Sequence, residues 1–440
     1  MKGQLWETKP LGFWPKAKEL RAKWNKSVTD EKLIVGQGAV TYHCDWGAAF
    51  PNFKIIEDNP IGSVMSYSNQ NFARKARLAS EIRGWGRELC GYVNNCWGAQ
   101  FLGYLEDGSP FPRRKFVVPP PCLCDQHAKR GQQVRDFEPV PQWGMDMPVY
   151  HGSYDEDREV AMLDHRTFCQ LRQLNDVERV FGIKLDEEKL HEIMESAVAI
   201  EQYFKEVSIL MAETIPSPLS VKDLYSIFTL GGLTKVDHDE MVAFWKQVRD
   251  EIKWRAENKI AAVGNERFRW VEHHPPSWHF LKYYRYMEKY GAVCLGSAYS
   301  HRVSSGSLER KPDGSIERRE MLSYPKDTPL VTLEDAVRVF WTPDARDPHH
   351  QKMDDYIRPS ALLEHADVFQ ADGVLLAIWR SGVGCTLMRK EQAMRLREAG
   401  YSVMHYEGSQ CGDRTDLDEK RLIEQLDSWM ESNGLRKLED

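Results

Sequence analysis

The chain has 440 residues, of which 42% are hydrophobic and 28% are charged. Because one hydrophobic core rarely organises a chain of this length, two or three domains are expected. The formal net charge of -7, without a clustered Lys/Arg stripe, excludes a general nucleic-acid-binding protein.

Membrane insertion and disulfide bonding are not expected either. The longest apolar run, residues 374–379, is too short to span a bilayer, and the first residues lack the apolar stretch of a secretory signal. We therefore expect a cytoplasmic protein that makes no membrane contact. The nine cysteines in such a reducing compartment favour inert thiols or metal ligands over a disulfide framework.

The first part of the chain predicts an arm followed by an α/β domain. Residues 1–30, rich in Lys, Trp and Pro, are interpreted as an N-terminal arm that docks on a larger body. In residues 31–153, apolar strands at 115–119 and 147–151 alternate with helical stretches such as 71–88. This alternation is typical of a mostly parallel sheet.

Residues 154–265 predict a helical segment, because three long stretches place apolar residues at helical spacing. Asp186, with Lys189 and Leu190, predicts a capped helix start. A turn at Pro216 and Pro218 interrupts the segment.

Residues 266–440 return to the alternating pattern and predict a second α/β domain. The polar stretch 304–319 predicts an exposed loop or hairpin inserted in it. The expected elements are helix 279–289, strand 292–296, helix 333–340, strand 373–379, helix 389–398, strand 401–406 and a final amphipathic helix 418–432.

Three cysteines stand out by position, because ligands in open α/β sheets bind beyond the carboxyl ends of strands. Cys385 follows strand 373–379 in RSGVGC, where two glycines allow a tight turn beside a bulky ligand. Cys124 follows strand 115–119 in PPPCLCDQ, and Cys90 lies in ELCGYVNNCWG, between a helix and a Gly-flanked, helix-like stretch. A buried inert thiol is the simpler interpretation of any one of them alone.

Other motifs are weaker evidence for a binding or catalytic site. The C-x-C spacing of Cys122 and Cys124 is not that of common zinc or ferredoxin sites. No P-loop and no complete dinucleotide fingerprint is present, so neither ATP nor NAD binding is predicted. Two clusters could bind a metal but lack the spacing that aims two imidazoles at one ion; they contain His273, His274 and His279, and His349, His350, Asp354 and Asp355.

Several longer blocks across roughly residues 80–430 carry a further signal. They include RELCGYVNNCWG, LDEEKLHEIMESAVAIEQYF, ETIPSPLSVKDLYSIF, RFRWVEHHPPSWHFLKYYRYMEKYGAVCLGS and LLAIWRSGVGCTLMRKEQAMRLREAGYSVMHYEGSQCGDRTD. These blocks, and their order, resemble the benzoyl-CoA reductase and 2-hydroxyacyl-CoA dehydratase family. Within the family, the likeness is greatest to the B subunits of ATP-dependent, class I benzoyl-CoA reductases.

This resemblance implies a 4Fe–4S cluster between two flavodoxin-like or Rossmann-like α/β domains with an intervening helical segment. Matching the family's ligand blocks implies Cys90, Cys124 and Cys385 as the cluster ligands. The reserve candidates are Cys122, Cys96 and Cys44, in that order. Three thiolates would leave one iron with an open position, at which chemistry could occur.

The resemblance also implies a reaction and partners. The complex would reduce the ring of benzoyl-CoA to a cyclohexadiene carbonyl-CoA with electrons from ferredoxin. ATP would be hydrolysed on separate electron-activating subunits, and a homologous C subunit would complete the site. Because a histidine pKa lies near cellular pH, His301 is the first candidate proton donor and His127 the second.

Alternatives remain open at this point. A 2-hydroxyacyl-CoA dehydratase subunit would use similar ligands, a non-catalytic electron-relay or scaffold subunit would hold a cluster with four cysteines, and a zinc hydrolase could use the histidine clusters. The aromatic segment 278–290 is expected near the acyl cavity or the subunit contact, or as a plain core helix.

Overall fold

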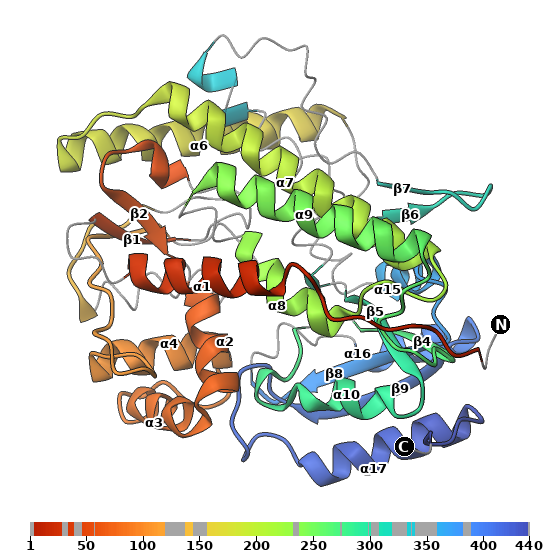
Figure 1. Cartoon of the computed structure of the whole chain (residues 1–440). Coiled ribbons are helices and arrows are strands. Elements are labelled where there is room, and N and C mark those ends of the chain that lie inside the picture. The colour runs from red at the N-terminus through yellow and green to blue at the C-terminus, as the bar shows by residue number, and fades with distance from the viewer. Residues whose placement is uncertain are drawn as a thin grey trace.

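The computed structural model describes residues 4–28, 34–38, 46–56, 58–118, 137–143, 156–231, 237–272, 275–297, 299–300, 308–318, 332–335, 337–338, 359–381 and 389–438. Its two larger sheets are parallel and are joined and covered by helices, so the predicted α/β class is confirmed (Figure 1). None of the helices in these ranges is long and apolar enough to cross a membrane.

The first sheet is small and has the order β2-β1-β3. Its strands are β1 (Ile34–Gly38), β2 (Phe53–Ile56) and β3 (Phe116–Val118), and the short helix η1 (Trp46–Ala49) lies between β1 and β2. The rings of Phe53 and Phe116 stack with centroids 4.6 Å apart in a separate hydrophobic core. The strand predicted at 115–119 is confirmed as β3, and the one predicted at 147–151 lies outside the described residues.

Three helices follow β2, namely α2 (Asp58–Ser68), α3 (Gln70–Glu81) and α4 (Gly91–Leu102). Helices α3 and α4 pack closely, since a Cβ added at Gly98 would lie 1.8 Å from the carbonyl oxygen of Ala76. The helix predicted at 71–88 is shorter than expected, because the chain turns at Gly84 with φ of 90°. The shortened helix leaves a loop that leads directly to Cys90.

The helical segment contains α6 (Glu156–Phe181), α7 (Glu187–Glu213), α8 (Val221–Gly231) and α9 (His238–Glu257). The predicted start at Asp186 is confirmed, because its carboxylate accepts the backbone N–H of Lys189 at 2.9 Å. The turn predicted at Pro216 and Pro218 separates α7 from α8.

The beginning of the chain lies along the helical segment of the same chain, where α1 (Trp14–Val28) runs beside α8 and α9 (Figure 1). The Glu251 carboxylate accepts the backbone N–H groups of Gly12 and Phe13 at 2.8 and 2.9 Å. The buried Arg255 donates to the carbonyls of Lys9 and Pro10. The Glu251 bonds satisfy N–H groups at the start of α1 that have no intrahelical partner, and the Arg255 bonds satisfy carbonyl groups of the segment before it.

The second sheet has the order β5-β4-β8-β9, and all of its strands are parallel. They are β4 (Phe268–Glu272), β5 (Ala292–Ser297), β8 (Gly373–Trp379) and β9 (Ser402–Gly408). The three strands expected in this part of the chain are confirmed, whereas the interior strand β4 was not predicted. The hairpin expected in 304–319 is present as β6 (Leu308–Arg310) and β7 (Ile316–Arg318).

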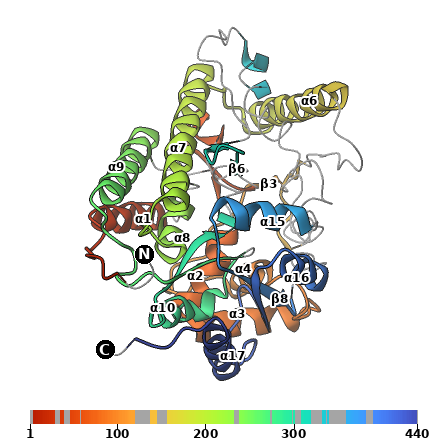
Figure 2. The ribbon, with the colours of Figure 1, turned by 90° about the vertical axis from the view of Figure 1, so that its right-hand side faces the viewer.

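Helices cover both faces of this sheet. On one face, Trp270 stacks on Tyr284 of α10, and Phe268 contacts Trp429 of α17. On the other, Gly296 faces the ring of Phe369 beyond α15, which lies beside α16 (Figure 2). The bounds are η2 (Trp278–Phe280), α10 (Lys282–Glu288), α15 (Pro359–Val368), α16 (Arg389–Glu398) and α17 (Glu419–Ser432), which confirms the helices predicted at 389–398 and 418–432.

Candidate functional site

Cys90 lies at the N-terminus of α4, where it is the residue before the first helical turn. Its side chain is buried, and its carbonyl accepts the N–H of Asn94 at 2.9 Å. The positive end of a helix dipole and its unpaired N–H groups favour negative charge, so this position suits a thiolate. The sequence predicted this arrangement from the Gly-flanked stretch after Cys90.

The loop after β9 meets Cys90 directly. Gln410 donates from Nε2 to the Sγ of Cys90 at 3.3 Å, and both side chains are buried. A Cβ added at Gly91 would lie 2.6 Å from the carbonyl oxygen of Cys411, so only glycine allows this approach. Asn95 donates to the same oxygen at 3.3 Å.

The end of β8 reaches the same place. The buried hydroxyl groups of Ser381 and Ser409 are 2.7 Å apart, and the N–H of Arg380 donates to the carbonyl of Gly408 at 2.9 Å. Ser381 is the last described residue before Cys385, which follows four positions later in the sequence. The carboxyl ends of β8 and β9 and the start of α4 therefore meet at one edge of the sheet.

Of the three predicted ligands, Cys90 is the one that lies within the described residues. Cys96, a reserve candidate, is six positions further along α4 and so faces a different side of the helix. Its sulfur lies 3.9 Å from Nη2 of Arg114. The other predicted site residues, Cys124, Cys385, Cys122, Cys44, His301 and His127, lie outside the described residues.

The surroundings of Cys90 fit a ligand of an iron–sulfur cluster. The sulfur is buried at the end of a helix and accepts an N–H, and such hydrogen bonds to sulfur are one means by which proteins tune clusters. Within the described ranges, no group of three or more His, Cys, Asp or Glu side chains could hold a metal ion. A cluster at Cys90 would need further ligands from other segments.

Cys411 is a neighbour that sequence reasoning did not single out. It is fully buried, and burial, with Cys90 close by, raises the pKa of its thiol well above the usual value. The hydroxyl groups of Tyr92 and Ser66 form hydrogen bonds with this thiol. Its position just after β9 was a usable signal, because the same criterion had selected Cys385 after β8.

A buried ion pair fixes the loop after β9. Arg77 of α3 is 1% exposed and pairs with Asp416 and, at 3.6 Å, with Asp413. Burial alone would raise the pKa of Asp416, but Arg77 holds that pKa below its usual value. The Asp416 carboxylate therefore stays charged, and its pair with Arg77 keeps the loop against α3.

A buried carboxylate, Glu272, ends β4 in the same sheet. Three tyrosine hydroxyls donate to it, from Tyr225 at 2.6 Å, Tyr284 at 2.5 Å and Tyr283 at 3.1 Å. Burial raises the pKa of Glu272 to about 7, although the three hydrogen bonds oppose this rise. Sequence reasoning missed this group, because β4 itself was not predicted.

Trp278 separates Glu272 from Cys90. Its ring contacts Tyr225 with centroids 5.4 Å apart, its indole N–H donates to Tyr92, and its backbone N–H donates to Gln410 at 2.8 Å. The neighbouring His279 is buried, which lowers its pKa to about 4, so its imidazole is neutral at pH 7. Neither ring nitrogen has a hydrogen-bond partner among the described residues.

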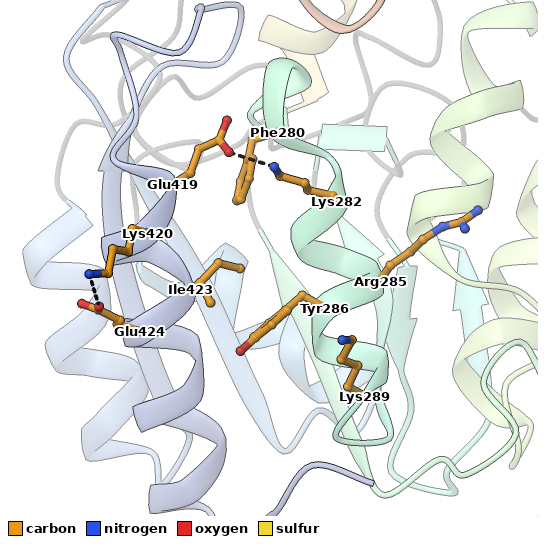
Figure 3. Close-up of a pocket in the computed structure, with 9 residues that line it drawn as sticks. All are labelled: Phe280, Lys282, Arg285, Tyr286, Lys289, Glu419, Lys420, Ile423 and Glu424. Atoms are coloured by element: carbon orange, nitrogen blue, oxygen red, sulfur yellow. Dashed lines mark ion pairs between the residues drawn. The ribbon is translucent and has the colours of Figure 1, made fainter. Parts of the chain in front are cut away.

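The aromatic segment 278–290 has two faces. Trp278, Tyr283 and Tyr290 are buried within the subunit, as expected for a core helix. The outer face forms one side of an open groove of about 750 Å³ between α10 and α17 (Figure 3). The groove is lined by Phe280, Lys282, Arg285, Tyr286, Lys289, Glu419, Lys420, Ile423 and Glu424.

Comparisons with known proteins support the family resemblance seen in the sequence on its dehydratase side, but not the finer likeness to benzoyl-CoA reductase B subunits. The family model described as 2-hydroxyglutaryl-CoA dehydratase, D-component, matches residues 72–432. The chain is also 22% identical over 228 residues to the α subunit of (R)-2-hydroxyisocaproyl-CoA dehydratase from Clostridioides difficile. That alignment covers 50% of this chain and 54% of the relative, so the chain spans about half the length of the relative.

Replacing Arg77 by Met should destabilise the protein by about 3–5 kcal/mol, because two carboxylates would remain buried without their cation. Chemical unfolding would measure the change. The control is Arg179→Met on α6, which breaks an ion pair between Asp176 and a side chain that is 73% exposed, and should cost at most about 1 kcal/mol. Equal losses in the two variants would contradict a bracing role for Arg77.

The stability of the protein should depend on pH through Glu272. Between pH 4.5 and about 7 the unfolded chain loses this proton while the folded chain keeps it. The free energy of unfolding relative to Glu272→Gln should therefore fall by about 3 kcal/mol as pH rises through that range. Unfolding curves of both proteins at several pH values test this, and a constant difference would contradict it.

Proposed function

The chain belongs to the 2-hydroxyglutaryl-CoA dehydratase D-component family, and on that premise we propose that it is an iron–sulfur subunit of a complex that removes water from a 2-hydroxyacyl-CoA thioester. The observation that carries this proposal is the family match over residues 72–432, which includes Cys90 at its buried helix terminus. The similarity to a 2-hydroxyisocaproyl-CoA dehydratase subunit supports the same class of substrate.

The proposed cofactor is a 4Fe–4S cluster held by Cys90, Cys124 and Cys385. When bound, it would supply an electron to the thioester carbonyl of the substrate. Two residues near Cys90 would support the cluster. Gln410 orients the sulfur through its N–H, and the buried Trp278 shields this side of the site from water.

The route of the chain supports Cys385 as a second ligand. Ser381 is hydrogen-bonded to Ser409, and Ser409 is adjacent to Gln410, which contacts the sulfur of Cys90. Cys385 is four residues after Ser381, and four extended residues span at most about 14 Å. This length allows Cys385 to reach Cys90. Its two glycines, Gly382 and Gly384, permit the turn that this requires.

A second candidate function is ATP-dependent reduction of benzoyl-CoA. The block WHFLKYYRYMEKYGAVCLGSAYSH favours it, because this stretch resembles the B subunits of the reductases. In both functions the complex would contain a homologous subunit and separate ATP-hydrolysing subunits that deliver electrons, with ferredoxin as the donor for the reductase. His301 and His127 remain proposed proton donors.

Replacing Cys90 by Ser should lower the iron and sulfide content of the anaerobically purified complex by at least about half, because one thiolate ligand is lost. The control is Cys169→Ser, whose sulfur lies on α6 at 3.6 Å from His165 and should not affect iron content. Unchanged iron in Cys90→Ser would exclude Cys90 as a ligand. A wild-type complex that shows the spectrum of a cluster but no turnover would instead favour an electron-relay subunit.

The substrate class is decided by turnover of the anaerobic complex with its partner subunits, ATP and a reductant. We expect conversion of a 2-hydroxyacyl-CoA to the 2-enoyl-CoA, followed by mass spectrometry, and none in the complex with Cys90→Ser. Formation of a cyclohexadiene carbonyl-CoA from benzoyl-CoA, with no dehydration, would overturn the dehydratase and establish the reductase.

A further inference from the structure

Glu272 is placed unusually for a structural carboxylate. It is 4% exposed at the carboxyl end of an interior strand, the edge at which ligands of parallel sheets bind. A buried carboxylate is usually paired with a cation, whereas the groups that bond Glu272 are the hydroxyls of Tyr225, Tyr283 and Tyr284. This arrangement supports both the ionised and the protonated carboxyl, because a hydroxyl group can donate or accept.

We propose that Glu272 is a positioning and proton-holding residue that exchanges protons with the Cys90 site through Tyr283, Tyr406 and Ser277. This inference rests on the proposed function, because it assigns a residue to the reaction at that site. It adds a group on a different strand from any of the predicted ligands.

The route is a chain of buried hydroxyl groups. The hydroxyl of Tyr283 lies 3.1 Å from Oε2 of Glu272, and its ring contacts that of Tyr406 of β9 with centroids 6.3 Å apart, close enough for Tyr283 to lower the pKa of Tyr406. The hydroxyl of Tyr406 is 3.4 Å from that of Ser277. A Cβ added at Gly408 would lie 3.6 Å from Oγ of Ser277, so the route ends against the last residue of β9.

The end of the route adjoins the wall of the site. Ser277 immediately precedes Trp278, whose backbone N–H donates to the carbonyl of Gln410. The side chain of Gln410 in turn donates to the sulfur of Cys90. The hydroxyl group of Ser277 therefore lies next in sequence to the residue that is bonded to the loop at Cys90, and the proposal assigns the last proton transfer to this short interval.

Among the described residues, the groups that face Glu272 include no cation that would hold its carboxyl in the ionised form. From α8 it faces Tyr225, from α10 Tyr283 and Tyr284, from β5 Cys294 and Ser297, and from β9 Tyr406. Its register partner on β8 is Leu375, and His365 of α15 faces Gly296 on the opposite side of the sheet. No Lys or Arg in the described residues contributes to its pKa, which burial raises to about 7.

The proposed reaction needs a group that gives up one proton and takes up another. Elimination of water breaks the Cα–OH bond and one Cβ–H bond of the acyl chain and forms a C=C bond. The departing hydroxide takes one proton to become water, and the Cβ proton is released. A carboxyl that gives one proton and regains one is unchanged after each turnover, with no net gain or loss of electrons.

The test uses Glu272→Gln in the complete anaerobic complex, because Gln keeps the shape and hydrogen bonds but has no dissociable proton. Turnover of a 2-hydroxyacyl-CoA should fall by about 100-fold, with unchanged iron content and substrate KM. Tyr283→Phe should also lower turnover. The matched control is Tyr290→Phe, since Tyr290 is equally buried but donates to Asp427 at 2.6 Å and has no place in the route.

A second readout does not need turnover. Infrared spectra of the folded wild-type chain, recorded between pH 5 and 9, should contain a protonated-carboxyl C=O band that disappears near neutral pH and is missing in Glu272→Gln. A carboxylate that stays ionised throughout this range would show no such band. Absence of a band that depends on Glu272 would overturn the proposal.

The two proposals fail separately. Normal turnover and an unchanged pH profile in Glu272→Gln, with the infrared band present in the wild type, would overturn the role of Glu272 in the reaction and leave the dehydratase intact. Conversely, a wild-type complex that dehydrates no 2-hydroxyacyl-CoA would overturn the proposed function. The infrared band would then still decide whether Glu272 holds a proton.

Discussion

The contact between the loop after β9 and the first turn of α4 is the constraint on which the site depends. These segments are more than 300 residues apart in the sequence, yet Gln410 reaches the sulfur of Cys90. The approach requires Gly91, because any side chain there would meet the carbonyl of Cys411. Arg77 stabilises it from α3 by neutralising the two carboxylates of the loop. Packing, glycine and buried charge thus act together on one short segment.

The second sheet determines which chemical groups lie near this contact. Parallel strands place their carboxyl ends at one edge, so Glu272, Ser381 and Gln410 are brought to neighbouring positions by topology alone. The core around these ends is aromatic, and Trp278 contacts both Tyr225 and Tyr92. Such a core excludes water, which strengthens hydrogen bonds and makes the protonation of a lone carboxyl sensitive to its surroundings.

The relation between the two proposals follows from this setting. A thiolate at a helix terminus suits an electron-transferring metal group, and a carboxyl with a pKa near neutrality suits proton exchange. Elimination of water and ring reduction both need protons near the electron-rich centre. The family match accounts for the first group, whereas the second is visible only in the folded chain.

The sequence alone determined the elements whose pattern is local. Strand β8, helices α16 and α17 and the cap at Asp186 follow from periodicity and capping residues, and Cys90 follows from the start of a Gly-flanked helix. Strand β4 was missed because Arg269 and Glu272 interrupt its apolar run, although both are buried, Arg269 in a pair with Glu266 and Glu272 among tyrosine hydroxyl groups. Only the tertiary structure placed Gln410 and Cys411 beside the start of α4 and surrounded Glu272 with tyrosine hydroxyl groups. Their roles depend on contacts between segments far apart in the chain, and neither hydrophobic periodicity nor motif spacing records such contacts.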